Sequence, residues 1–130
     1  MTTDLWMLVW TALLALLMPT TYAVGRLSAP GGSEWAFGNR DAPLAVPAWT
    51  ERAVRAHANL VENLGPFIIL VLAAHVGGKA NATTALGATI FFWARVVYVG
   101  VYIAGIIYLR TLVFFVAVIG EVLILMQLFR

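Results

Sequence analysis

The sequence predicts an all-α membrane protein in which four helices cross the bilayer. Its 130 residues are 62% hydrophobic and 11% charged, with a mean hydropathy of +0.92. A soluble domain of this size carries about 25% charged residues. Four apolar runs, each long enough to cross about 30 Å of hydrocarbon as a helix, alternate with polar or glycine-containing connectors.

The first predicted span covers residues 5–24, which contain no charged side chain. A cleaved signal peptide is the alternative, because residues 21–23 resemble a small-residue cleavage site. The start of the chain lacks the basic residues of a signal peptide, and the apolar run is long. We therefore expect this segment to be a retained membrane helix.

A connector over residues 26–50 separates the first two spans and is rich in glycine and proline. We expect it to be irregular, with the second helix starting between residues 47 and 53. The second span covers about residues 52–76. It tolerates Pro66, because neighbouring groups in a membrane bundle can satisfy the backbone groups that proline leaves free.

The third and fourth spans are predicted over residues 83–106 and 112–129, with a connection around residues 108–110. Arg95 is the only charged residue inside the third span, and Glu121 lies inside the fourth. Small residues along the third span allow a neighbouring helix to pack closely.

Basic residues predict the orientation, because short cytoplasmic loops carry an excess of lysine and arginine. Five of the eight basic residues lie on the side of the first and third connectors, and these are Arg26, Arg40, Arg52, Arg55 and Arg110. The opposite side holds Lys79 and Arg130. The sequence thus predicts a cytoplasmic 26–50 connector and both termini outside the cytoplasm. The absence of cysteine and of a long targeting signal fits a bacterial inner membrane.

A polar stripe occurs at the start of the second span. Its members are spaced by three, four and three residues, and they are Arg52, Arg55, Asn59 and Glu62. At about 100° per residue they fall within an arc of about 80° on one helix face. Charged groups in a membrane helix are costly unless they face protein or a water-filled cavity, so the stripe predicts a functional site.

A second polar group lies on the third span, where Arg95, Tyr98 and Tyr102 share one face. Arg95 lies near the middle of the span and requires a partner. Glu62 lies at a similar depth on the second span and is the partner that we expect, with Glu121 as a competing one. Polar contact between helices, without any chemistry, is the alternative role for Arg95 and Glu62.

The segment ERAVRAHANLVENLGPF, residues 51–67, resembles the signature of the MAPEG family, the membrane-associated proteins in eicosanoid and glutathione metabolism. The ERxxRAHxNxxEN core is long and specific, and ARVVYVGVY at residues 94–102 is similar to the family as well. The resemblance extends over essentially the whole chain. It implies a left-handed four-helix bundle that assembles as a homotrimer, with glutathione bound between subunits near the cytoplasmic side.

The resemblance also implies roles for individual residues. With the polar stripe, the expected glutathione-binding residues are Arg52, Arg55, Asn59, Glu62, Arg95, Tyr98 and Tyr102. Arg110 matches the arginine that stabilises the glutathione thiolate in the family. A nearby cation favours the thiolate over the thiol, and the thiolate is the nucleophile.

The implied function is that of a glutathione-dependent membrane transferase, acting also on lipid hydroperoxides, with a lipophilic substrate that enters from the bilayer. A non-catalytic membrane binding or assembly protein on the same fold is the main alternative. A small transporter or channel is a third hypothesis, although no continuous polar face crosses the spans. The chain has no cysteine, so any reactive thiol must come from a ligand. Its net charge of +2 gives no indication of a nucleic-acid partner, and its two histidines lack metal-ligand spacing.

Overall fold

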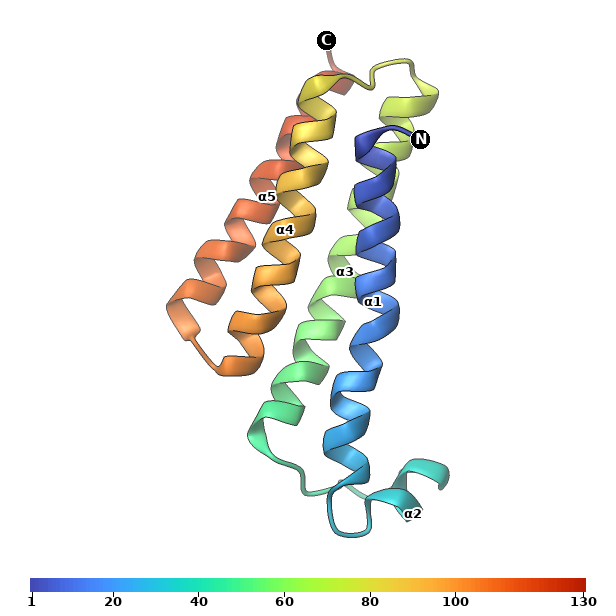
Figure 1. The fold of residues 1–130 in the computed structure, drawn as a ribbon, viewed down its shortest axis with the longest axis vertical. Helices are drawn as coiled ribbons and strands as arrows, with labels where there is room; N and C mark the ends of the chain where they lie inside the picture. Colours follow the sequence, from blue (N-terminus) through green and yellow to red (C-terminus); the bar gives the residue numbers. More distant parts are fainter.

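A computed structural model describes all 130 residues, which form four long helices and a short one (Figure 1). The helices are α1 (Thr3–Leu27), α2 (Gly32–Phe37), α3 (Ala48–Val76), α4 (Ala82–Ala104) and α5 (Ile107–Leu128). All except α2 are long and apolar enough to cross a membrane. The prediction of an all-α protein with four membrane-spanning helices is therefore confirmed.

The long helices run up and down beside one another (Figure 1). Helices α3 and α4 contact each other and every other long helix, whereas α1 and α5 do not touch. The N-terminus, the α3–α4 turn and the C-terminus lie at one end of the bundle, and α2 lies at the other (Figure 1). The α4–α5 turn stops short of the level of α2, so α1 and α3 extend beyond it.

The 26–50 connector is not wholly irregular, because it contains α2, which no local pattern predicted. The next helix, α3, begins at Ala48, inside the region where we expected its start, and continues through Pro66. Most of the connector's remaining residues form turns or extended segments, in keeping with its glycine and proline content.

The connection between α4 and α5 is shorter than the sequence indicated. Gly105 adopts a φ of 83°, in the left-handed region that glycine enters without steric cost, and it ends α4 abruptly. Only Ile106 follows before α5 begins at Ile107. As a consequence Arg110 lies in the first turn of α5 rather than in a connector.

The core of the bundle is centred on two stacked rings. Phe67 of α3 and Phe91 of α4 are fully buried, with ring centroids 4.0 Å apart and planes inclined by 16°. Small and branched side chains surround this pair, and they include Val71, Ala74, Ala88, Ala94, Ala117 and Ile124. Large apolar side chains on the outer helix faces remain exposed, as a bilayer solvent permits.

Gly87 of α4 and Gly120 of α5 allow these two helices to approach closely. A Cβ added at Gly120 would lie 2.5 Å from the Gly87 carbonyl oxygen and 2.9 Å from the Phe91 nitrogen. Both are backbone atoms, so the helices must move apart to accommodate it. We expect Gly120→Ala to lower the free energy of unfolding by about 1–3 kcal/mol, measured by denaturant unfolding in detergent.

The matched control for this substitution is Gly100→Ala in α4. A Cβ at Gly100 would meet no atom within 4 Å, and alanine has the higher helix propensity. Gly100→Ala should therefore be neutral or slightly stabilising. Equal stability of the Gly120→Ala variant and the wild type would contradict the close packing of α4 on α5.

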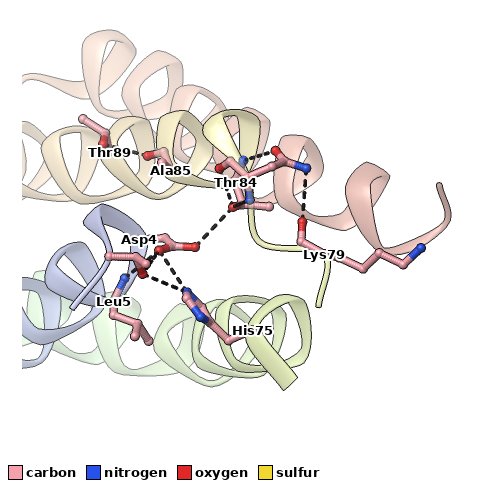
Figure 2. A network of polar contacts seen from close by, with 9 residues as sticks. Asp4, Leu5, His75, Lys79, Thr84, Ala85 and Thr89 are labelled. Atoms are coloured by element: carbon pink, nitrogen blue, oxygen red, sulfur yellow. Dashed lines mark hydrogen bonds and ion pairs between the residues drawn. The ribbon is translucent and has the colours of Figure 1, made fainter. Parts of the chain in front are cut away.

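A polar network joins three helices at the end of the bundle where the N-terminus lies (Figure 2). Asp4 of α1 is 2% exposed and lies 3.0 Å from Nε2 of His75 of α3. It also accepts a hydrogen bond from the Thr84 hydroxyl of α4 at 3.2 Å and another from the Thr2 hydroxyl. Asn81 caps α4 by accepting from the backbone nitrogen of Thr84. This network lies at the opposite end of the bundle from α2. Its role is structural, because it joins α1 to α3 and α4.

Candidate functional site

The two predicted polar groups meet toward the other end of the bundle. The N-terminal half of α3, the C-terminal half of α4 and the first turn of α5 all lie on this side (Figure 1). The polar stripe of the second predicted span, which we now call the α3 stripe, therefore packs near the polar group of α4. Two antiparallel helices that are consecutive in the chain require this arrangement.

Arg95 is the centre of the site and is fully buried. Its Nη1 donates to Oδ1 of Asn59 at 2.9 Å. Its guanidinium carbon lies 5.1, 5.2 and 5.4 Å from the ring centroids of Phe91, Phe114 and Tyr98. Ring faces attract cations, so three aromatic side chains help to hold the charge inside the bundle. The Nε and Nη2 groups of Arg95 have no hydrogen-bond partner within the chain.

The predicted ion pair between Arg95 and Glu62 is not formed, so this prediction was wrong. Neither Glu62 nor the competing Glu121 has an oxygen within 4.0 Å of a basic group. Asn59 accepts the hydrogen bond instead. Three residues correspond to about 60° of rotation on a helix, and this rotation carries Glu62 to the exposed side of α3.

The α3 stripe is thus divided between two environments. Nε of Arg52 donates to the Ile103 carbonyl at 2.8 Å, near the C-terminal end of α4. A cation at this position also interacts favourably with the negative end of the helix dipole. The side chains of Arg55 and Glu62 are exposed and form neither a hydrogen bond nor an ion pair within the chain. This edge of α3 therefore presents an unpaired cation and an unpaired anion to its surroundings.

Tyr102 connects the buried Arg95 group to Arg110. The ring of Tyr102 lies edge-on to that of Tyr98, with centroids 5.5 Å apart. The guanidinium of Arg110 lies over the Tyr102 ring at 4.5 Å. Arg110 is partly exposed, and its side chain donates no hydrogen bond within the chain. Together with the N-terminus of α5, it offers unused N–H donors and positive charge to an anion.

The structure therefore brings six of the eight predicted residues to the α3–α4–α5 contact, namely Arg52, Asn59, Arg95, Tyr98, Tyr102 and Arg110. Sequence reasoning predicted Tyr98 but missed the other two aromatic residues around Arg95, Phe91 and Phe114. Phe91 precedes Arg95 by one helical turn, so helical spacing could have found it. Phe114 comes from α5, and no local pattern connects it with Arg95. No cavity of the structure is lined by any of the eight predicted residues.

A model of the MAPEG family matches residues 5–130, nearly the whole chain. The chain belongs to the MAPEG family. No curated protein and no solved structure matches it. As a MAPEG protein with four apolar helices, it is an integral, multi-pass membrane protein. The family includes glutathione transferases and related proteins. The arginine and tyrosine residues in the series of contacts from Asn59 to Arg110 are therefore the candidate functional residues.

Proposed function

We propose that this MAPEG protein is a glutathione-dependent membrane transferase. It would stabilise the glutathione thiolate for attack on a lipophilic electrophile and would also reduce lipid hydroperoxides. The observation that carries the proposal is a continuous series of contacts from Asn59 through Arg95, Tyr98 and Tyr102 to Arg110. The series runs from the family signature on α3 to a guanidinium with unused donors.

The chemistry of glutathione matches the groups that the subunit leaves free. Glutathione carries two carboxylates, one ammonium, two peptide groups and a thiol. The Arg55 guanidinium suits a carboxylate, with two parallel hydrogen bonds, and Glu62 suits the ammonium. Nδ2 of Asn59 has no partner in the subunit and can donate to a peptide carbonyl. Arg95 is fully buried, so we assign it to the positioning of Asn59 and Tyr98.

A second copy of the chain is needed to enclose the ligand. Arg55 and Glu62 lie on an open edge of α3, and no cavity in the single subunit reaches them. Unpaired charges within a span require protein partners. A homotrimer, as the family implies, would cover this edge and complete the site near the cytoplasmic side. Exposed apolar faces of the bundle would give a lipophilic substrate access from the bilayer.

The proposed reaction requires a positioned thiolate and an electrophile. Positive charge from Arg110 and from the N-terminus of α5 favours the thiolate form of bound glutathione. The thiolate sulfur then forms a bond to the electrophilic carbon, and the leaving group departs with its electron pair. The thiol releases its proton to water as it ionises, so no general base on the protein is required.

Glutathione binding tests this proposal before any substrate is known. We expect isothermal titration of the detergent-solubilised protein to show saturable binding. Arg55→Gln should weaken it by about 1.5–3 kcal/mol, the value of a hydrogen bond to a charged group. Lys79→Gln is the matched control, because it removes one positive charge at the opposite end of the bundle. Absence of saturable binding by the wild type would eliminate the proposal.

A non-catalytic assembly protein on the same fold is the second candidate, and a specific observation favours it. The bonds from Arg52 to Ile103 and from Arg95 to Asn59 join helices within one subunit and require no ligand. Polar side chains commonly join membrane helices in this way. Arg110 distinguishes the candidates, because it makes no such bond. Arg110→Ala should abolish thiolate formation if the protein is a transferase and should have little effect if the protein is purely structural.

A further inference from the structure

A second group of aromatic and basic side chains lies where α1 meets α2 and the loop that follows. The guanidinium carbon of Arg26 is 4.8 Å from the ring centroid of Tyr22 and 5.2 Å from that of Trp35. The guanidinium carbon of Arg40 is 5.1 Å from the same Trp35 ring. We call these four residues the α1–α2 cluster. Two positive charges thus share one indole ring.

Neither arginine of the cluster has an anionic partner in the subunit. The nearby acidic residues Glu34 and Asp41 form no ion pair with them. Arg26 donates no hydrogen bond, and Arg40 donates only to the Ala36 carbonyl, through Nε at 3.3 Å and Nη2 at 3.0 Å. Most N–H donors of the two guanidiniums are therefore free. Guanidinium groups in this state suit a phosphate or carboxylate group.

The cluster lines a cavity of about 400 Å³ that combines charged and apolar walls. The apolar wall comes from α1 and α2, with Pro19, Ala23, Leu27 and Phe37. Phe37 is 88% exposed, which is unusual for so large an apolar side chain unless lipid or protein covers it. The cavity therefore offers a cationic region beside an apolar one.

The position of the cavity along α1 matches the membrane surface. Helix α1 has 25 residues, so at 1.5 Å per residue it is roughly 37 Å long. The hydrocarbon core of a bilayer is about 30 Å thick, and the polar headgroup region lies outside it. Arg26 lies in the last turn of α1 and thus at the level of the headgroups, with Pro19 and Ala23 deeper along the helix.

The backbone holds Arg40 in an uncommon conformation. Its φ is 60°, and it is the one residue other than glycine with a positive φ. Such a conformation costs of order 1–3 kcal/mol and is concentrated at functional sites. Nε1 of Trp35 donates a hydrogen bond to the Ala42 carbonyl at 2.7 Å. This bond ties the loop that follows α2 to the indole ring and keeps Arg40 against that ring.

We propose that the α1–α2 cluster binds an anionic phospholipid. The phosphate lies between the guanidiniums of Arg26 and Arg40, and an acyl chain follows Pro19 and Ala23 along α1. Basic pockets at a membrane surface recognise anionic headgroups in this way. The bound lipid would hold the connector against the bilayer. This site is independent of the proposed glutathione chemistry, because it shares none of the residues proposed to bind glutathione or to activate its thiol.

Native mass spectrometry of the purified protein can test the lipid site. The protein is titrated with phosphatidylglycerol or with phosphatidylcholine of identical acyl chains, and bound lipid is counted. We expect tighter binding of phosphatidylglycerol. Each arginine near the surface contributes about a fivefold gain, so R26Q/R40Q should weaken phosphatidylglycerol binding by roughly 30-fold. Arg40→Gln alone should weaken it by about fivefold, and Arg40 is exposed, so its replacement leaves the core intact.

The matched control is K79Q/R130Q, which removes the same net charge at the other end of the bundle. It should leave phosphatidylglycerol binding unchanged. Equal binding of the two lipids by the wild type would overturn the proposal, as would an equal loss in both double variants. Displacement of bound phosphatidylglycerol by inorganic phosphate or glutathione would assign the cavity to a small soluble anion, and this result would also overturn it.

Discussion

Replacement of Arg95 by alanine is expected to lower the free energy of unfolding by about 3–5 kcal/mol. Arg95 is fully buried, so the substitution leaves a cavity between the rings of Phe91, Tyr98 and Phe114. It also removes the donor that Oδ1 of Asn59 accepts from. Denaturant unfolding in detergent, followed by circular dichroism, measures the change.

Two further variants separate the causes of this effect. Arg95→Met retains much of the volume and removes a cation with two unpaired donors, so it should be less destabilising than Arg95→Ala. Lys79→Ala removes an exposed cation that forms no ion pair, in the turn between α3 and α4, and it should change stability by no more than about 0.5 kcal/mol. If Arg95→Ala were as stable as Lys79→Ala, Arg95 would not be the buried centre of the site.

Replacement of Arg110 by alanine is expected to lower turnover with a lipophilic electrophile by roughly 10- to 100-fold near neutral pH, because losing a cation that lowers the thiol pKa by about 1–2 units reduces the thiolate fraction by that factor. The side chain of Arg110 packs on Tyr102 and donates no hydrogen bond within the subunit, so stability should change little. Steady-state kinetics of the purified variant beside the wild type measure the loss. Arg130→Ala, in the C-terminal residue, is the matched control.

The pH dependence provides an independent check on the role of Arg110. A cation beside the thiol lowers its pKa, so the wild-type rate should reach its plateau at a lower pH than the rate of Arg110→Ala. The variant should recover activity as pH rises, because the thiol then ionises without help. Arg110→Lys retains the charge and should lie between the two. Superimposable pH profiles would exclude thiol activation by Arg110.

Much of the fold and part of the site follow from sequence patterns. Four apolar runs with few charges predict four spans, because hydrocarbon excludes unpaired polar groups. Helical spacing correctly places Arg95 and Tyr98 on one face, and the antiparallel arrangement of two consecutive spans brings Asn59 beside them. The ERxxRAHxNxxEN segment identified the family from a short stretch of sequence.

The pairing of individual side chains was less predictable. An arc of about 80° is wider than the contact between two helices, so spacing alone could not decide whether Asn59 or Glu62 faces Arg95. The cation–π contact between Arg26 and Trp35 depends on the path of an irregular connector. The Asp4–His75 contact joins residues that are distant in sequence, although the predicted topology places both at one end of the bundle.

The measurement that tests the central claim most directly is ultraviolet difference absorbance of the purified protein titrated with glutathione, with Arg110→Ala measured in parallel. The proposed function predicts a saturable thiolate band in the wild type that is lost in the variant, while saturable glutathione binding persists in both. A protein that binds glutathione without a thiolate band, or a band that survives in Arg110→Ala, would contradict thiolate stabilisation by Arg110.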